Sequence, residues 1–214
     1  FPNIKIAIMH TTNVIKILNR LSETKPIVLV FGGSQGAQKI NEAIIEIIQN
    51  KKNTKYQILW ATGPKQYDIV KEILEKKGIN IDKIDNVKIV PYIYNMEEIM
   101  NVSDIIVARS GAMTITEIAT LGKPSILIPL PNVSGDHQLY NAKVLANINA
   151  ANIILNNELT GEILDKAIKN IVLDKAKINQ MSENALKAAT YEVEDKIYKE
   201  INSLVNKKKQ NVEP

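Results

Sequence analysis

Short runs of apolar, mostly β-branched residues alternate along the chain with longer segments in which apolar residues recur every three or four positions. The short runs predict strands at residues 26–31, 56–61, 86–90, 104–108, 124–129 and 152–155, and most are continuously apolar, as buried parallel strands are. The longer segments predict helices near 37–50, 65–77, 95–102, 114–121, 137–149 and 160–173. This alternation predicts an α/β fold with a doubly wound parallel sheet.

The segments on either side of this alternation are expected to differ from it. Residues 1–24, which include the apolar stretch 4–8, are expected to be an interdomain connection, and residues 25–174 the sheet domain. After Asp174 the pattern is helical only, through an amphipathic stretch at 191–205, so 175–206 are expected to be C-terminal helices. Residues 207–214, with three consecutive lysines, are expected to be a disordered basic tail. The chain begins at Phe1 rather than Met, which suggests a piece of a longer protein.

Composition narrows the classes of protein to consider. A chain of 214 residues with 45% hydrophobic content can bury one core but is too short for two full domains. The net charge is +4, and because lysine and glutamate are scattered along most segments, no nucleic-acid partner is predicted. The absence of cysteine excludes disulfides and thiol chemistry, and two histidines disfavour a His-rich metal site. No stretch has the length of a membrane span or the pattern of a signal peptide, so a cytoplasmic protein is expected.

Ligands of open α/β sheets bind beyond the carboxyl ends of the strands, and the first candidate loop there is Gly32–Ala37. Its glycines leave backbone N–H groups open at the positive end of a helix, which suits a phosphate or diphosphate. A tight turn that needs glycine dihedrals explains the same residues equally well. Gln38 and Lys39 stand where a P-loop has Lys-Ser/Thr, which disfavours ATP or GTP hydrolysis. No acidic residue ends the next strand, which disfavours a nicotinamide cofactor.

The second loop is "ARSGAMTITE", residues 108–117, after the fourth strand. The next helix is expected to start at Thr114, and Thr114 and Glu117 have the spacing of a capping box. This interpretation leaves Arg109 and Ser110 unexplained, and a cation at the end of a strand suits an anionic ligand. A carboxylate at this place can also accept hydrogen bonds from both hydroxyls of a ribose, so both roles remain open for Glu117.

The third loop is "PLPNVSGDHQLYNA", residues 129–142, which leads into a helix at about residue 137 or 138. Asp136 is expected to be its N-cap, and Asn141 to be a surface residue of the first turn or a ligand contact. The pattern gives Gln138 no structural role. A lone histidine such as His137 is more often a loop residue than a general base.

The motifs "GGSQGA", "RSGAMTITE" and "DHQLYNA", in this order and spacing, resemble the C-terminal half of the MurG family over nearly the whole chain. These bacterial glycosyltransferases move N-acetylglucosamine from a UDP donor to the lipid-linked muramyl-pentapeptide of peptidoglycan synthesis. The resemblance implies a GT-B fold of two Rossmann-like domains, with this chain as the C-terminal one. It also implies UDP-N-acetylglucosamine as ligand, no cofactor and no metal, and a peripheral place on the inner face of the cytoplasmic membrane for the full-length protein.

The resemblance further implies a donor site shared by the three loops. Ile93 would offer its backbone to the uracil, with Met96 close by, and Glu117 would take the ribose hydroxyls. Arg109 would shape the nucleotide pocket. The complete set of implied site residues is Lys16, Gly33, Ser34, Gln35, Gly36, Ile93, Met96, Arg109, Ala112, Met113, Thr114, Glu117, Gln138 and Asn141.

The diphosphate and sugar would lie against the glycine loop, where Ser34 and Gln35 face them, and against residues 112–114. Gln138 and Asn141 would reach the donor sugar. Neutralisation of the leaving diphosphate would fall to N–H groups and helix ends.

The sequence departs from the family pattern in two places. "TTNVIK", residues 11–16, stands for a "TGNPVR"-like segment, so Lys16 replaces a diphosphate-facing arginine and cannot offer a bidentate fork. The N-terminal domain, with the acceptor site and the family's proposed catalytic histidine, is not in this sequence. No catalytic residue is therefore predicted here, and the chain alone is expected to bind the donor without transferring sugar. A subunit of a split glycosyltransferase and a non-catalytic nucleotide-binding module are the alternatives.

Overall fold

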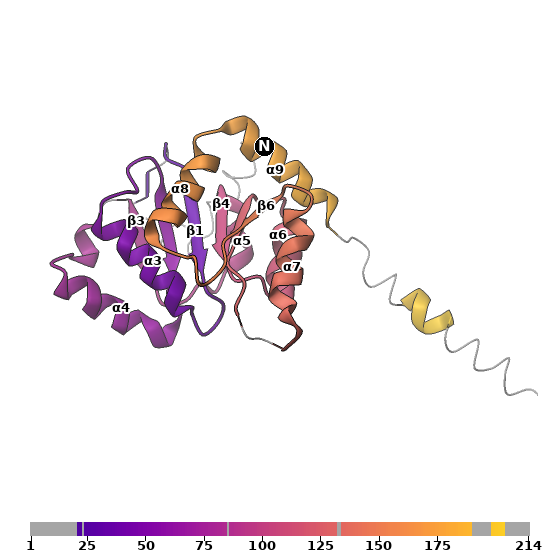
Figure 1. The fold of residues 1–214 in the computed structure, drawn as a ribbon, viewed down its shortest axis with the longest axis horizontal. Coiled ribbons are helices and arrows are strands. Elements are labelled where there is room, and N and C mark those ends of the chain that lie inside the picture. The colour runs from indigo at the N-terminus through magenta and orange to yellow at the C-terminus, as the bar shows by residue number, and fades with distance from the viewer. Residues whose placement is uncertain (1–20, 23, 85, 132–133, 190–197, 204–214) are drawn as a thin grey trace, which may run out of the picture.

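A parallel sheet forms the centre of the protein (Figure 1). The computed structural model describes residues 21–22, 24–84, 86–131, 134–189 and 198–203. The strands lie in the order β3-β2-β1-β4-β5-β6, and every neighbouring pair is parallel. Their bounds are β1 (Ile27–Phe31), β2 (Gln57–Ala61), β3 (Val87–Val90), β4 (Ile105–Ala108), β5 (Ser125–Leu127) and β6 (Ala151–Ile153). This confirms the predicted doubly wound α/β fold.

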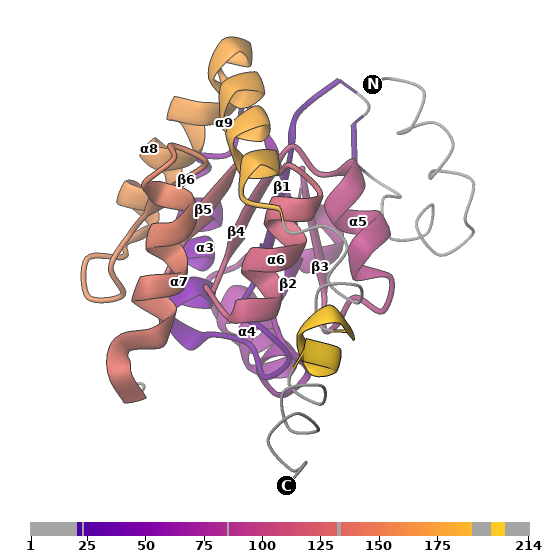
Figure 2. The same cartoon turned by 90° about the vertical axis from the view of Figure 1, so that its right-hand side faces the viewer.

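Helices cover both faces of the sheet (Figures 1 and 2). On one face α3 (Gln38–Gln49), α4 (Pro64–Lys76) and α8 (Gly161–Val172) pack on the first core cluster. On the other face α5 (Met96–Val102), α6 (Ala112–Thr120) and α7 (His137–Ala146) pack on the second. Two 3-10 turns, η1 (Ile81–Lys83) and η2 (Ser134–Asp136), complete the described connections.

The central strands β1, β2 and β4 are mostly apolar because helices bury them on both faces. Along β1, Val28 and Val30 contact the α3 layer, whereas Leu29 and Phe31 contact the α6 layer. All five residues of β2 are buried, including Trp60, whose indole N–H donates to Asn41 on α3 at 2.9 Å. The alternation of side chains therefore supplies two separate cores from one continuous apolar run.

The helix α9 (Lys175–Lys187) follows α8 directly and lies across one end of the molecule (Figure 2). Asp174 caps it by accepting a hydrogen bond from the backbone N–H of Lys177 at 3.0 Å. Its Ser182 hydroxyl donates to the carbonyl of Gly122, which fixes α9 against the connection between α6 and β5. Residues 198–203 are also helical. The predicted connection 1–24 lies largely outside the described residues, as do most of the predicted helix 191–205 and all of the tail 207–214.

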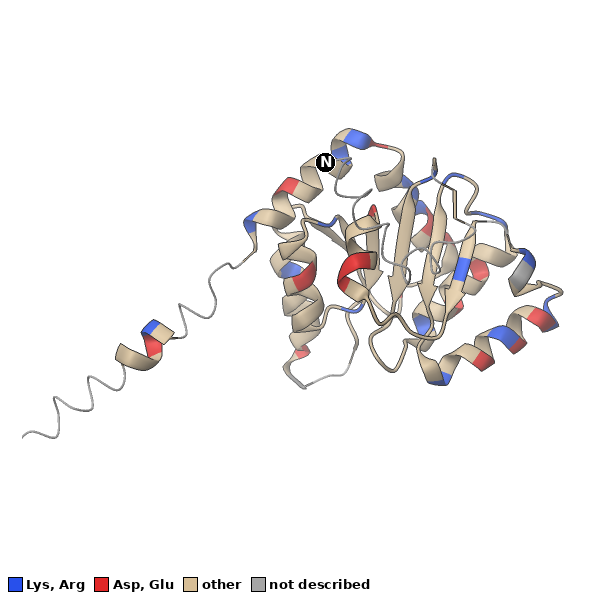
Figure 3. Cartoon of the chain, turned by 180° about the vertical axis from the view of Figure 1, so that it is seen from behind, with Lys and Arg blue, Asp and Glu red and all other residues tan. Residues whose placement is uncertain are grey.

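The charged side chains are spread over the outer helices (Figure 3). Along α4, lysines and acidic residues alternate, and Lys76 forms an ion pair with Glu72 one turn earlier. Such mixed faces are typical of solvent-exposed helices. In the part of the chain that the structure describes, no helix is long and apolar enough to cross a membrane.

Candidate functional site

The loop between β1 and α3 is held as a tight turn with an open backbone. Gly33 and Gly36 both have positive φ, at 87° and 79°, and the N–H of Gly36 donates to the carbonyl of Gly33 at 3.0 Å. Ser34 and Gln35 form the exposed tip of this turn. Ala37 stands at the N-cap position of α3 with no side-chain cap. The first N–H groups of α3 therefore remain available at the positive end of the helix.

Close backbone packing fixes this turn against the loop after β2. A Cβ atom on Gly36 would overlap the carbonyl oxygen of Thr62, and one on Gly63 would overlap the backbone of Gly36. Asn41 adds a buried link, because its Nδ2 donates to the carbonyl of Thr62 at 3.1 Å. A Cβ on Gly33 would meet nothing within 4 Å, so this glycine faces open space. The turn needs the positive φ of these glycines and its outer side is open, and their role in holding a phosphate stays a prediction.

The loop after β4 is tied to the loop after β5 by side chains. Arg109 donates through Nη1 to the carbonyls of Ile128 and Pro129 at 3.0 and 3.2 Å. Burial lowers the pKa of Arg109 from its ordinary value. Its neighbour Ser110 is fully buried and donates to the carbonyl of Gln138 at 2.7 Å. The arginine therefore holds the two loops at a fixed spacing.

Two residues of the third loop have structural partners that the sequence pattern did not reveal. The Oε1 of Gln138 accepts a hydrogen bond from the backbone N–H of Leu130 at 3.0 Å. Asn141 donates to the carbonyl of Ser110 at 3.1 Å, so it is not merely a surface residue. Asp136 does stand at the N-cap position of α7, but it has a left-handed backbone, with φ 50°, and makes no side-chain cap. The prediction that its side chain caps the helix is wrong.

The start of α6 also corrects a prediction. The helix begins at Ala112, with Gly111 at the N-cap position and no side-chain cap, rather than at Thr114. Thr114 is thus already the third helical residue, and Thr114 and Glu117 cannot form a capping box. In the part of the chain that the structure describes, the N-cap residues Gly111 of α6 and Ala37 of α3 supply no side-chain cap to the first turns of these helices. Two uncapped helix starts therefore lie at the carboxyl edge of the sheet, which is an arrangement that favours an anion.

A cavity of about 530 Å³ opens where these loops meet. Five of the predicted site residues line it: Gly33, Gly36, Arg109, Thr114 and Gln138. Ser34 and Gln35 lie in the turn beside it, and Asn141 donates to the carbonyl of Ser110, the residue between the lining residues Arg109 and Gly111. Ala112 and Met113 are exposed at the start of α6, and Met113 exposes 72% of its surface. The structure thus brings the three predicted loops together.

Three predicted residues lie apart from this cavity, on the α5 and α6 side of the sheet. The side chain of Ile93 is buried in the second core cluster, so it can offer a ligand only its backbone. Met96 is half-buried at the start of α5. Glu117 is half-buried on α6, where burial and the nearby carboxylate of Glu97 raise its pKa. Lys16 lies outside the described residues.

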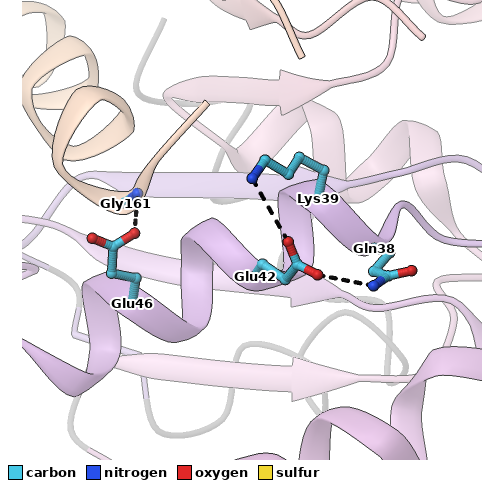
Figure 4. Close-up of polar contacts among 5 residues, drawn as sticks. All are labelled: Gln38, Lys39, Glu42, Glu46 and Gly161. Atoms are coloured by element: carbon cyan, nitrogen blue, oxygen red, sulfur yellow. Dashed lines mark hydrogen bonds and ion pairs between the residues drawn. The ribbon is translucent and has the colours of Figure 1, made fainter. Parts of the chain in front are cut away.

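The cavity also has lining residues that the sequence did not single out as site residues. They belong to the first turns of α3, to the loop after β5 and to the loop after β6: Gln38, Lys39, Glu42, Leu130, Pro131 and Asn156. On α3, Glu42 accepts a hydrogen bond from Gln38 at 2.9 Å and pairs with Lys39 at 3.8 Å (Figure 4). Gln38, Lys39 and Glu42 lie within two turns of the glycine loop, and Leu130 and Pro131 belong to the third predicted loop, whereas no sequence signal pointed to Asn156. Among the described residues, no group of three or more His, Asp or Glu could hold a metal ion.

Comparisons with known proteins match this architecture. The sequence matches the glycosyltransferase family 28 C-terminal domain over residues 27–197. It is 41% identical over 189 residues to the UDP-N-acetylglucosamine--N-acetylmuramyl-(pentapeptide) pyrophosphoryl-undecaprenol N-acetylglucosamine transferase of Leuconostoc citreum. The matched residues cover 88% of this chain and 51% of that protein. The protein of the same name from Bacillus cytotoxicus is 36% identical over 217 residues, covering 97% of this chain and 58% of that protein.

A solved structure shares the fold. The crystal structure of Acinetobacter baumannii MurG superposes with a TM-score of 0.73 at 26% identity, covering 85% of this chain and 53% of that chain. The present chain thus spans about half the length of the curated relatives that it matches.

Proposed function

We propose that the chain is the half of a glycosyltransferase that binds UDP-N-acetylglucosamine, because it belongs to the family of glycosyltransferase family 28 C-terminal domains. The complete enzyme would transfer the sugar to a lipid-linked muramyl-pentapeptide, as the names of the relatives state for those proteins. The observation that carries this proposal is the open glycine turn between β1 and α3. It lines a cavity together with residues of the loops after β4 and β5.

The diphosphate would lie between the two uncapped helix starts. The N–H groups of the Gly33–Ala37 turn and of the first turn of α6 would donate to its oxygens, with Ser34 and Gln35 at the tip of the turn. Residues 112–114 would line the nucleotide near the phosphates. These donors are backbone groups held by packing, so they require no rearrangement when the bond to the sugar breaks and charge develops on the leaving UDP. Lys16 would add a positive charge beside them.

The nucleoside would extend toward the α5 and α6 side of the sheet. Ile93 would offer its backbone to the uracil edge, with Met96 beside it. Glu117 would accept hydrogen bonds from the ribose hydroxyls, which gives a half-buried carboxylate a partner. Arg109 would act indirectly, because its hydrogen bonds to two carbonyls keep the loop after β5 in place.

The donor sugar would lie within reach of Gln138 and Asn141. Both side chains already hold the loops in place, and each amide keeps capacity for a further hydrogen bond. The acceptor hydroxyl and the base that takes its proton would come from a domain outside this sequence. The chain would thus position and activate the leaving group, and the other half would supply the nucleophile.

Isothermal titration calorimetry with UDP, UMP and NAD tests the proposal. We expect UDP to bind at least tenfold more tightly than UMP, because the glycine turn contacts the second phosphate, and we expect NAD to bind weakly. Binding should persist in EDTA, since backbone N–H groups rather than a metal hold the phosphates. Equal affinities for UMP and UDP would refute the placement of the diphosphate.

A further inference from the structure

A buried amide lies directly behind the glycine turn. Asn41, in the first turn of α3, is only 3% exposed, and all other buried residues of α3 are isoleucine or alanine. Asparagine is a poor helix former, and a polar group buried without hydrogen bonds destabilises a fold. The partners of this amide therefore decide why a polar residue stands in an otherwise apolar face.

Asn41 uses both ends of its amide. Its Oδ1 accepts a hydrogen bond from the indole N–H of Trp60 at 2.9 Å, and its Nδ2 donates to the carbonyl of Thr62 at 3.1 Å. Both hydrogen bonds are buried, so water does not compete with them. An amide supplies an acceptor and a donor at the same time, which leucine and ionised aspartate do not. One side chain thus connects α3, β2 and the loop after β2.

The carbonyl of Thr62 is also the group against which the glycine turn packs. A Cβ atom on Gly36 would overlap this oxygen. The N–H of Thr62 donates to the carbonyl of Val90 at the end of β3, at 3.1 Å. The loop after β2 is thus held by β3 on one side and by Asn41 on the other, and its oxygen limits how closely Gly36 approaches. Gly36 in turn lines the cavity.

We propose that Asn41 is a positioning residue for the diphosphate, because it fixes the Thr62 carbonyl and so sets the geometry of the Gly33–Ala37 turn. This inference rests on the proposed function, in which that turn holds the second phosphate of UDP. Asn41 is buried and is not among the residues that line the cavity, so it acts through the backbone. Backbone donors that are already in place bind a phosphate more tightly than donors that must first be ordered.

The competing explanation is that Asn41 only gives the buried Trp60 a hydrogen-bond acceptor. The two explanations differ in which ligands they affect. A contact that serves only the fold changes stability and leaves the relative affinities of nucleotides alone. A misplaced glycine turn weakens only those ligands that carry a second phosphate. The ratio of the dissociation constants of UMP and UDP therefore distinguishes them.

The variant Asn41→Leu tests the proposal, with Trp60→Phe as its control. Leucine has the branched shape of asparagine and neither polar atom, so both hydrogen bonds are lost. Trp60→Phe removes the indole N–H and leaves Asn41 able to donate to Thr62. We expect Asn41→Leu to raise the dissociation constant of UDP by about threefold to tenfold and that of UMP by less than about twofold. Trp60→Phe should leave the ratio within about twofold of wild type.

Thermal unfolding of the same variants measures their stability separately. Both should lower the midpoint, since Asn41→Leu leaves a buried indole N–H unpaired and Trp60→Phe leaves a cavity. The double variant should be more stable than the sum of the two losses predicts, because it has no unpaired indole. Its ratio of UMP to UDP dissociation constants should nevertheless be as low as that of Asn41→Leu. The double variant also replaces Asn41→Leu if the single variant does not fold.

Calorimetry well below the midpoint of each variant ensures that only folded protein is titrated. A wild-type ratio in Asn41→Leu or in the double variant would overturn the positioning role of Asn41. An equal fall of the ratio in Trp60→Phe would also overturn it, because any loosening of this core would then suffice. Failure of the wild-type chain to bind UDP, or to prefer it over UMP, would instead refute the proposed function.

Discussion

The substitution Gly33→Ala separates a turn that merely needs glycine from a turn that contacts a ligand. Gly33 has φ 87°, and a Cβ placed on it would meet no atom within 4 Å. The cost to the fold is therefore the left-handed backbone alone, about 1 to 2 kcal/mol, reduced by the lower entropy of the unfolded alanine chain. For a domain of this size a loss of about 1 kcal/mol lowers the thermal midpoint by about 2 to 4 °C.

The matched variant is Gly36→Ala, which has nearly the same dihedral, φ 79°, but no room. Its Cβ would overlap the carbonyl oxygen of Thr62, which belongs to the backbone of the neighbouring loop and cannot rotate away. Overpacking of this kind adds about 1 to 3 kcal/mol, so we expect Gly36→Ala to lower the midpoint by about 5 to 15 °C. The difference between the two variants measures the close approach of the loops.

Affinity should follow a different order from stability. The methyl group of Gly33→Ala projects toward the cavity, where the diphosphate needs the bare backbone, so UDP affinity should fall about tenfold or more, a loss of about 1.4 kcal/mol. Differential scanning fluorimetry and calorimetry on the same samples measure both quantities. If Gly33→Ala binds UDP as the wild type does while its midpoint falls by the expected few degrees, the glycine serves only the turn. The diphosphate would then lie elsewhere.

Two further substitutions test single side chains. Glu117→Gln should raise the thermal midpoint at pH 7. Burial and Glu97 raise the pKa of Glu117, so its ionised form is less favourable in the folded state than in the unfolded state. The gain in midpoint should vanish as the pH falls below the ordinary glutamate value of 4.5, where the carboxyl group is protonated in both states. The same variant should weaken UDP binding about tenfold through the ribose, and unchanged affinity would remove Glu117 from the site. Tyr56→Phe removes the hydroxyl that donates to buried Asp165 at 2.9 Å, and urea unfolding should show a loss of about 1 to 3 kcal/mol. UDP affinity should not change, because Tyr56 precedes β2 at the opposite edge of the sheet, and a matched loss of affinity would contradict this assignment.

The sheet was predictable from the sequence because strands that are buried on both faces are continuous apolar runs. A run such as "YQILWA" has no amphipathic pattern, and only burial on both faces explains it, as β2 shows. Strand ends were predicted to within two residues. The rule that ligands lie beyond the carboxyl ends then placed Gly33, Arg109 and Gln138 at one edge, and the structure puts all three on one cavity.

Features that depend on tertiary partners could not be predicted. The spacing of Thr114 and Glu117 fits a capping box, but α6 starts two residues earlier, next to Ser110, which hydrogen-bonds with the third loop. The Oδ1 of Asn156 is buried and has no hydrogen-bond donor among the described residues, which depends on the packing around it and not on the local sequence. The roles proposed for the individual site residues in binding remain predictions.

The strand order has a consequence for how the protein is made. The central strand β1 pairs on one side with β2, which follows soon after it, and on the other side with β4. The N–H of Ile27 at the start of β1 donates to the carboxylate of Asp104, 77 residues later. During synthesis, β1 therefore leaves the ribosome long before its second neighbour exists, with one hydrogen-bonding edge open in the meantime. A nascent chain that stalls before Ile105 would present this open strand edge to other chains, so the interval before β4 is made exposes the chain to aggregation.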